Sequence, residues 1–555
     1  MLLNSVIKAA VATFALYCGV ILEIGFSPCA AQEKSPPRPQ ADALAERFQN
    51  PDLLSFDELA VLASTAKPEG TLAARLSALL NTPFVHTETA TAEIQPHRPS
   101  VKGLGIVLRV GLWNIERGLN FELIQSALTD PTEFLRLTKT QDPLSPGQKE
   151  VIASQLATLQ GMDVLVLNES DWGMKRTEYR DVTRELAAAL HMNYAYGVEF
   201  VEVDPVFDMD TDQVHLTDAQ QDRRLQQDLQ VDRQRYHGLH GTAILSRYPI
   251  EHARIFRLPV CYDWYAKEYK AISKLEQGKQ WSAHKLFQER ALRELRHGGR
   301  MALVAEISVP DLPTGRATIV AMHLENKCPP ECRRRQMQGL LADLKPDRNP
   351  MVIAGDLNTT SRDNTPTSIR NEIMMRVTDY KFWIGQAVSH FHPLGVFQYA
   401  LVPVHYFHGY NDPTAFHLPI LWENRERALF DTVAKFRSAD DQAFDFRGER
   451  ERTLPPKGRT LADSNQRAGK GFSPTYAFTR DYGGLVGRFK LDWIFVKPFI
   501  EDPRRMEQSY QFAPHFPVTM RELNESVPDR ISDHPPMTVD LPLTDPTKLI
   551  VENQP

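Results

Sequence analysis

The tetrapeptide Gly355-Asp356-Leu357-Asn358 follows a short apolar run at residues 350–354 (PMVIA). An apolar run of this length that opens with proline predicts a buried strand. Aspartate and asparagine at the end of a core strand contribute little to packing, but they can hold a phosphate group or a metal ion at the edge of a sheet. Alone, a Gly-Asp-x-Asn sequence usually marks only a turn. Its meaning therefore depends on whether other strands end in the same way.

Three other predicted strands also lead into polar side chains. The apolar runs at 106–112, 163–167 and 317–322 are followed by Asn114, Glu169 and His323, respectively. Each of these residues, taken singly, is as easily explained as a solvated loop residue. Their repetition at the ends of buried runs instead predicts that they meet at one edge of the fold.

Two segments near the C-terminus carry the same residue types. A strand predicted at 488–496 has Asp492 set into it, and Asp533-His534 precedes the last predicted strand, 537–541. Carboxylate and amide oxygens are hard ligands suited to Mg²⁺ or Mn²⁺. Histidine can supply the base or acid that hydrolysis of a phosphate ester needs.

Helical signals separate some of these strands. The sequence Ser145-Pro146-Gly147-Gln148 has the form of a capping box with proline in the first turn. Apolar spacing predicts a helix at 331–344 that leads to the strand before Asp356. Leucines on one face predict a helical pair between residues 56 and 80, interrupted at 67–70.

The N-terminus has the layout of a signal peptide. Lys8 is the only charge before an apolar run from 9 to 22, and small residues precede an expected cleavage after Ala31. An uncleaved anchor is the alternative, although Glu23 shortens the apolar run. We therefore expect a signal peptide at 1–31 and a periplasmic or secreted mature protein.

Cysteine content and charge set further bounds. Beyond residue 31 the cysteines are Cys261, Cys328 and Cys332, of which Cys328 and Cys332 could close a small disulfide in an oxidising compartment. The formal net charge is −6, and the chain has no long basic run. This weakens the case for non-specific binding to a nucleic-acid backbone, but it leaves room for a local basic groove.

The composition divides the chain into parts. We expect a linker with a short helical segment at 32–102, a main domain at 103–545 and a tail at 546–555. Polar, charged or aromatic stretches predict insertions in the main domain at about 201–236, 262–298 and 360–471. Residues 382–422 are dense in aromatics and histidines. They form either a subdomain with its own core or a lobe that contacts substrate or a membrane surface.

The ordered set of motifs resembles the endonuclease/exonuclease/phosphatase superfamily, whose fold is that of deoxyribonuclease I. The motifs are Trp113-Asn114, Asn168-Glu169, the run 240–246 (HGTAILS), Met322-His323-Leu324, Gly355-Asp356-Leu357-Asn358, Leu491-Asp492-Trp493 and Ser532-Asp533-His534. The resemblance implies an α/β (α+β) fold. In that fold two packed, mostly antiparallel β-sheets flanked by helices form a four-layer sandwich, here with large insertions.

The resemblance also implies roles for individual residues. Glu169 is expected to bind Mg²⁺ or Mn²⁺, with Asn114 and Asp533 nearby. His534 is expected to be the general base, oriented by Asp492. Asp356 and Asn358 are expected to bind the phosphate or a second metal, while His323 and Arg300 are expected to contact the phosphate. The implied chemistry is in-line displacement at phosphorus.

The leading hypothesis is thus a metal-dependent phosphodiesterase or phosphatase. The alternatives are a secreted nuclease of the same fold and a non-catalytic binding protein with a relic active site. The substrate class stays open among lipids, inositol phosphates and nucleic acids, and the sequence indicates no protein partner. A nuclease should have a basic groove beside Asp356, whereas a lipid phosphodiesterase should expose the aromatics of 382–422.

Overall fold

Most of the apolar runs form strands that are covered on both faces. A computed structural model of the chain describes residues 50–87, 95–101, 104–138, 143–203, 231–270, 294–359, 425–445, 474–477, 488–503, 517–528 and 530–548. The described residues all belong to one compact unit, which spans Phe48–Pro555. The expected signal peptide and the aromatic stretch 382–422 lie outside the described residues. None of the described helices is long and apolar enough to cross a membrane.

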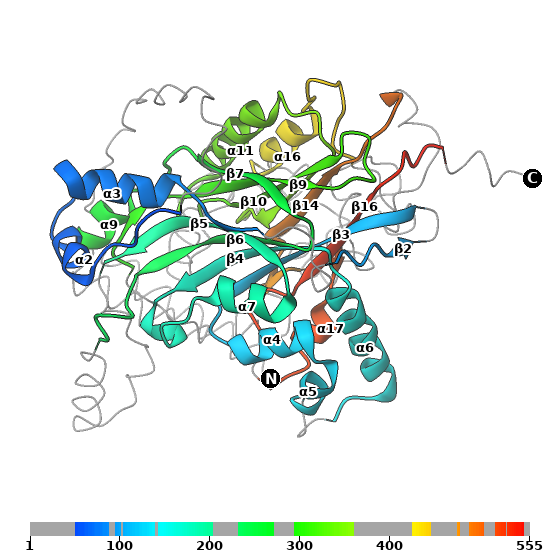
Figure 1. The fold of residues 1–555 in the computed structure, drawn as a ribbon, viewed down its shortest axis with the longest axis horizontal. Coiled ribbons are helices and arrows are strands. Elements are labelled where there is room, and N and C mark those ends of the chain that lie inside the picture. Colours follow the sequence, from blue (N-terminus) through cyan, green and yellow to red (C-terminus); the bar gives the residue numbers. More distant parts are fainter. Residues whose placement is uncertain are drawn as a thin grey trace, which may run out of the picture. The chain divides into compact units, whose positions relative to one another are not determined.

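The helices and strands alternate along much of the chain (Figure 1). The helices are α2 (Phe56–Ala63), α3 (Gly70–Asn81), α4 (Phe121–Thr129), α5 (Pro131–Arg136), α6 (Pro146–Gln160), a 3₁₀ turn (Lys175–Thr177), α7 (Val182–Leu190), α9 (Trp264–Lys270), α11 (Pro330–Leu344), α16 (Arg427–Ala434) and α17 (Arg521–Asn524). The capping box predicted before α6 is present, because Ser145 Oγ accepts from the Gln148 N–H and Gln148 Oε1 accepts from the Ser145 N–H.

The strands form two large sheets and one small hairpin. The strands are β1 (Phe84–His86), β2 (Ser100–Val101), β3 (Gly105–Arg117), β4 (Val164–Trp172), β5 (Asn193–Glu202), β6 (Leu239–Ser246), β7 (Ile250–Arg257), β8 (Arg296–Gly298), β9 (Met301–Ser308), β10 (Arg316–His323), β11 (Met351–Asp356), β12 (Tyr476–Ala477), β13 (Arg488–Phe489), β14 (Asp492–Lys497), β15 (Val518–Thr519) and β16 (Met537–Pro542). The single strand predicted at 488–496 is therefore wrong: β13 pairs with β12, and β14 joins a different sheet.

Both large sheets are mixed but mostly antiparallel. The larger sheet has the order β1-β5-β6-β4-β3-β16-β15, with β2 beside β3 and β8 beside β5. The smaller sheet has the order β14-β11-β10-β9-β7. Each contains one parallel pair among its described strands, β3 with β4 in the larger sheet and β10 with β11 in the smaller. These two parallel pairs supply many of the predicted polar residues.

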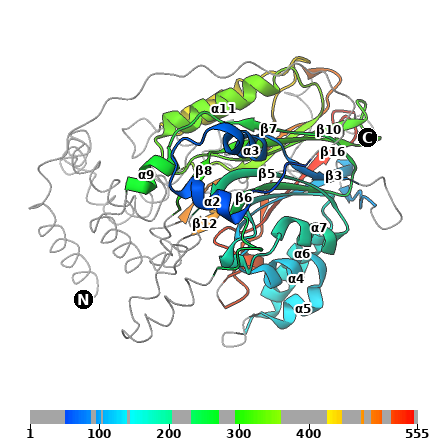
Figure 2. The ribbon, with the colours of Figure 1, turned by 60° about the vertical axis from the view of Figure 1, so that its left-hand side comes forward.

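Alternation of side chains along the strands builds the layers. In β4, Val164 and Val166 face the apolar cluster shared with the smaller sheet, whereas Leu165 and Leu167 face the helices on the other side. In Figures 1 and 2, α11 lies on one side of the strands, and α4, α5, α6 and α7 lie on the other. The predicted four-layer sandwich is confirmed, and burial of both sheet faces explains why these strands read as continuous apolar runs.

Two expected insertions contribute elements to this framework. β8, inside the stretch 262–298, pairs with β5 in the larger sheet. α16, inside the stretch 360–471, packs on α11 through Leu429, Phe430 and Val433. The remainder of these stretches is mostly outside the described residues.

The predicted pairing of Cys328 with Cys332 is wrong. The disulfide joins Cys261 to Cys332, which are 71 residues apart. Cys328 is buried beside it and donates a hydrogen bond to the Glu325 carbonyl, 3.4 Å away. Cys261 follows β7 and Cys332 lies in α11, so the bond ties two segments that only the tertiary fold brings together.

Candidate active site

Asn114 and Glu169 lie at bulges of the adjacent parallel strands β3 and β4. The β3–β4 pairing shifts register after Asn114, and β4 shifts against β6 on either side of Glu169. Both strands continue beyond these positions, so the expectation that they end there is wrong. Glu169 adopts a left-handed conformation, with φ at +55°. Bulges of this kind redirect a side chain out of the regular alternation, and Asn114 Nδ2 lies 3.2 Å from Glu169 Oε1.

Asn168, next to Glu169 in the chain, hydrogen-bonds to residues of both sheets. Its Nδ2 donates to Thr242 Oγ1 at 3.2 Å and to the Met322 carbonyl at 3.1 Å. Its Oδ1 accepts the backbone N–H of Asp356 at 2.9 Å. Asn168 and Thr242 belong to the larger sheet, whereas Met322 and Asp356 belong to the smaller. The buried amide of Asn168 therefore helps to hold the two sets of candidate residues in register.

Asp356 and Asn358 come from the end of β11. Asp356 Oδ2 lies 3.3 Å from Asn114 Nδ2, and Asp356 Oδ1 accepts the Asn358 N–H at 2.8 Å. Burial and the carboxylate of Asp492 raise the pKa of Asp356. The Asn358 Nδ2 donates to the Leu324 carbonyl at 3.0 Å, so this amide also braces the turn that carries it. The sequence prediction did not include this second contact.

His323 ends β10, where it pairs with Asp356 of β11. Its Nε2 lies 3.6 Å from Asp356 Oδ2, and its Nδ1 lies 2.7 Å from Arg300 Nη1. Arg300 also donates to Glu199 Oε2 at 2.7 Å, and all three side chains are buried. An arginine has no acceptor, so His323 Nδ1 must accept from it and the neutral ring carries its proton on Nε2. Arg300, predicted to contact phosphate, thus contacts His323 and Glu199 here.

His534 and Asp492 form a short contact in which His534 Nδ1 lies 2.6 Å from Asp492 Oδ2. The hydroxyl of Thr475 accepts the backbone N–H groups of Leu491 and Asp492, each at 2.9 Å. The His534 Nε2 lies 3.9 Å from a carboxylate oxygen of Asp356 and 3.9 Å from a carboxylate oxygen of Asp533. Burial lowers the pKa of His534, but the carboxylates of Asp492, Asp533 and Asp356 outweigh it and raise the pKa well above its usual range.

Glu116 is a carboxylate that the sequence prediction did not assign to the site. It accepts the backbone N–H of Asp533 at 3.2 Å from its place in the β3 bulge. Burial and the neighbouring Asp533 raise the pKa of Glu116 to about 7. Glu169 behaves oppositely, because Arg117 and His323 overcome the effect of burial and lower its pKa to about 2.

This set of side chains fits a hard divalent cation. Carboxylates from five separate segments converge, and burial together with their mutual repulsion raises the pKa values of Glu116 and Asp356. Asp492 Oδ1 is buried and has no hydrogen-bond partner among the residues that the structure describes. Oxygen donors of this type suit Mg²⁺ or Mn²⁺. Ligand atoms of Glu169, His323 and Asp356 lie within 4.8 Å of one another, so Glu169 and Asp356 are placed to hold the ion together. Asp533 remains an expected ligand. The Asn114 oxygen accepts the Glu116 N–H and its Nδ2 faces Glu169 and Asp356, so Asn114 would have to turn its amide to bind the ion.

Three charged residues near the site were not predicted from the sequence: Glu199 and Lys490, which are buried, and Arg117, which is half-buried. Glu199 lies in the apolar strand β5, and Arg117 follows Glu116 in the β3 bulge. Lys490 lies just before Asp492, with its Nζ 3.8 Å from the Met537 sulfur, and burial lowers its pKa to about 7. The position of Glu199 inside a short apolar run is a sequence signal that could have identified it as a buried charge. Nothing local distinguishes the other two from surface cations.

Comparison with known proteins agrees with this arrangement. A profile of the Endonuclease/Exonuclease/phosphatase family matches residues 111–534. No curated protein has a sequence that matches this chain. The fold is similar to an endonuclease/exonuclease/phosphatase from Beutenbergia cavernae, with 16% identity, 78% of this chain and 71% of that chain covered, and a TM-score of 0.33.

Two further solved structures show the same kind of similarity. The human Nocturnin catalytic domain, solved with a bound sulfate anion, has 11% identity, 80% and 98% coverage and a TM-score of 0.32. A 3′-5′ exonuclease from Neisseria meningitidis has 12% identity, 78% and 99% coverage and a TM-score of 0.33. The family profile covers more than half of the chain and spans every residue placed in the site above. The chain belongs to the endonuclease/exonuclease/phosphatase family.

Proposed function

We propose that this protein is a divalent-metal-dependent hydrolase of phosphoester bonds, with Mg²⁺ or Mn²⁺ as its cofactor. The observation that carries the proposal is the His534–Asp492 pair, whose free Nε2 faces the carboxylates of Asp356 and Asp533. A histidine held at Nδ1 by a carboxylate can take a proton at Nε2, because the carboxylate stabilises the imidazolium that forms.

His534 would act as the general base in this reaction. In the metal-free protein its three neighbouring carboxylates favour the protonated ring. A bound divalent ion would neutralise part of that negative charge, polarise the phosphoryl group and favour the attacking water in its ionised form. Asp492 would hold the ring so that Nε2, and not Nδ1, meets the water.

His323 would also contact the phosphoryl group, since the Nε2 atoms of His323 and His534 both lie near Asp356 Oδ2. Its Nδ1 accepts from Arg300, which leaves a proton on Nε2 of the neutral ring, directed toward Asp356. A proton in this position can be donated to a phosphoryl oxygen or to the leaving group. Glu199 offsets the buried charge of Arg300 and so supports this tautomer.

The substrate is proposed only at the level of its chemistry, a phosphoester of a lipid, an inositol or a nucleic acid. Two proteins of similar fold are named as an exonuclease and as a 2′,3′-cyclic phosphatase, and these names refer to different phosphoesters. The net charge of −6 gives no general attraction for nucleic acid. We retain the nuclease as the second candidate. The possible contact of 382–422 with a membrane surface stays a prediction of the sequence.

The test is a hydrolysis screen of the purified protein on bis(p-nitrophenyl) phosphate, sphingomyelin, inositol phosphates, RNA and DNA. Each assay is run with Mg²⁺, with Mn²⁺ and with EDTA. We expect turnover of at least one substrate that needs the metal and is lost in His534→Ala. The matched control is His252→Ala, which removes an exposed histidine from β7. Absence of any metal-dependent turnover would favour the binding protein with a relic site.

A further inference from the structure

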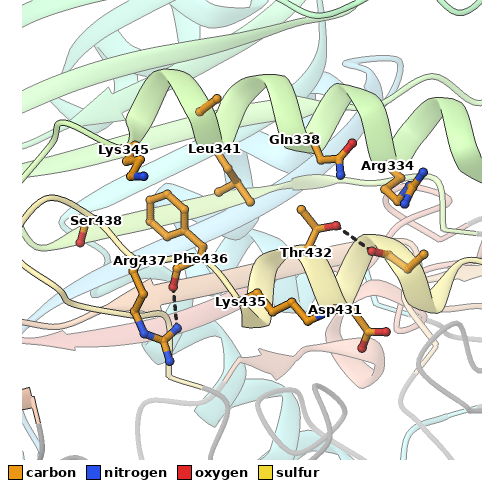
Figure 3. A pocket seen from close by; sticks show the side chains of 12 residues that line it. Arg334, Gln338, Leu341, Lys345, Asp431, Thr432, Lys435, Phe436, Arg437 and Ser438 are labelled. Carbon is orange, nitrogen blue, oxygen red and sulfur yellow. Dashed lines mark hydrogen bonds between the residues drawn. The ribbon is translucent and has the colours of Figure 1, made fainter.

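A groove of about 630 Å³ lies between α11 and α16, on the outer side of the smaller sheet (Figure 3). Arg334, Gln338, Leu341 and Lys345 line one wall. Their spacing of four, three and four residues places them on one face of α11. Arg334 and Lys345 are separated by about 16 Å along the helix, given a rise of roughly 1.5 Å per residue. None of the lining residues belongs to the candidate active site.

The opposite wall is supplied by α16 and the segment after it. Asp431 and Lys435 lie on or next to the helix, and Phe436, Arg437 and Ser438 continue from it. Figure 3 shows Leu341 and Phe436 between the two walls, with cationic side chains placed around them. The groove therefore has an apolar floor and a charged rim, which is the usual build of a small-molecule site.

Positive charge dominates the rim. Arg334, Lys345, Lys435 and Arg437 face a single lining carboxylate, Asp431. Asp431 lies 3.5 Å from Arg427, so a fifth cation already offsets its charge. Within the described part of the chain, none of the four rim cations forms an ion pair. This local excess contrasts with the net charge of −6 for the whole chain.

Arg334 has a buried hydrogen-bond donor that no described residue satisfies. Its Nε is shielded from water and makes no hydrogen bond in the described structure. A buried donor without an acceptor costs free energy. A bound anion could accept from the terminal nitrogens of the same guanidinium.

Buried contacts fix the spacing of the two walls, so the groove exists before any ligand binds. Arg333 of α11 pairs with Glu426, which precedes α16, through its Nε at 3.1 Å and through a second nitrogen, and both side chains are fully buried. Phe430 of α16 packs on Trp493 with ring centroids 4.5 Å apart. Because these contacts fix α16 against the sheet, a ligand would not have to order the site.

We propose that the groove binds a small polyanion carrying several phosphate groups, at a site separate from the catalytic one. Guanidinium and ammonium groups spread along the rim match several phosphates better than a single one. The volume suits a small molecule and is too small for a nucleic-acid duplex, and a concave site between two helices does not fit the flat surface of a bilayer. Free inositol polyphosphates and inorganic polyphosphates share this chemistry.

The experiment measures binding of tripolyphosphate and of inositol hexakisphosphate by calorimetry, in EDTA so that no turnover occurs. The groove variant carries Lys345→Gln, Lys435→Gln and Arg437→Gln. The matched control carries Lys67→Gln, Lys149→Gln and Arg184→Gln, which remove the same charge from exposed positions elsewhere. Thermal unfolding of both variants checks that they fold.

We expect the groove variant to weaken binding of at least one probe by about tenfold or more, and the control to change it less than about twofold. The probe that is more strongly affected identifies the source of the phosphates. Equal loss in both variants would mean non-specific attraction and would overturn the proposal. Loss in His534→Ala with no change in the groove variant would place the binding at the catalytic site and would also overturn it. Because the experiment measures binding and not turnover, a negative result would not contradict the proposed hydrolase activity.

Discussion

The side-chain oxygen of Asn168 accepts the backbone N–H of Asp356 at 2.9 Å, across the interface between the two sheets. The amide group of the same side chain donates to Thr242 and to the Met322 carbonyl. No other described side chain hydrogen-bonds to the backbone of both β10 and β11 from the larger sheet. Together with the direct contact between Asn114 and Asp356, these bonds fix the position of Asp356 relative to Asn114 and Glu169.

Replacing Asn168 with Ala should destabilise the fold and impair the site together. The change removes the Asn168 contacts of the buried Asp356 N–H and Met322 carbonyl, at a cost of about 1–3 kcal/mol in all. Urea unfolding followed by circular dichroism measures the loss. Asn81→Ala removes an exposed amide that bonds only within its helix, and it should cost far less. Equal stability losses in the two variants would contradict the bridging role.

His534→Ala and Asp492→Asn should lower turnover about 10²–10⁴-fold, the usual effect of losing a positioned base. The fold should persist, because each substitution removes a polar contact without opening a large cavity. The measurement is the rate on whichever phosphoester the screen identifies, together with thermal unfolding. Normal turnover in His534→Ala would show that another residue is the base.

Glu169→Gln should also lose activity, but because it binds the metal more weakly. A neutral amide is a weaker ligand for a divalent ion than a carboxylate, so the metal concentration needed for half-maximal activity should rise. Excess Mg²⁺ or Mn²⁺ should then restore part of the lost activity, whereas it should not restore His534→Ala. If the two variants respond identically to metal, the assignment of ligand and base is wrong.

Arg300→Met should destabilise the protein by about 3–5 kcal/mol, because it leaves Glu199 as a buried carboxylate without its partner. The double variant Arg300→Met with Glu199→Gln should recover much of this stability. It should not recover activity, because His323 still lacks the donor that sets its tautomer. Recovery of both properties would mean that Arg300 serves only the fold.

The raised pKa of Asp181 leads us to expect that the stability of the protein depends on pH. It accepts the Arg184 N–H at the start of α7, and burial raises its pKa from 3.8 to about 6. A raised folded-state pKa means that the protonated form favours the fold. The stability it contributes is fully present below about pH 3.8 and is lost as pH rises to about 6.

Asp181→Asn keeps a good N-cap residue and removes this ionisation. The variant should be more stable than the original protein at pH 7.5, by about 3 kcal/mol, and nearly equal to it near pH 4. Urea unfolding of both proteins across this range provides the comparison. A difference that does not vary with pH would contradict the raised pKa.

The disulfide can be checked by peptide mapping without reduction. We expect a peptide pair that links Cys261 to Cys332, with Cys328 alkylated only after unfolding. Cys261→Ser should lower stability by about 2–4 kcal/mol in oxidised protein, since the bond closes a long loop. The same substitution should have little effect when the original protein is also reduced. A Cys328–Cys332 link would restore the pairing predicted from the sequence.

The family and the order of the site residues could be predicted from the sequence because their signals are local. An apolar run followed by a polar residue, as at residues 350–358, needs only neighbouring positions to be recognised. The capping box at Ser145 and the helical spacing of α11 are equally local. Asp492, Asp356 and His534 were predicted as a set by their order along the chain, and the structure places them together.

Contacts between distant segments could not be predicted in this way, because they form only when the chain is packed. Glu199, Arg300 and His323 come from different strands or their flanks, and their pairing depends on how the two sheets pack. The bulges at Asn114 and Glu169 are register shifts between strands, which no single strand reveals. Cys261 meets Cys332 only because β7 and α11 lie close in the fold. Short-range preferences act on each segment alone, whereas burial of charge, register and disulfide pairing are properties of the packed whole.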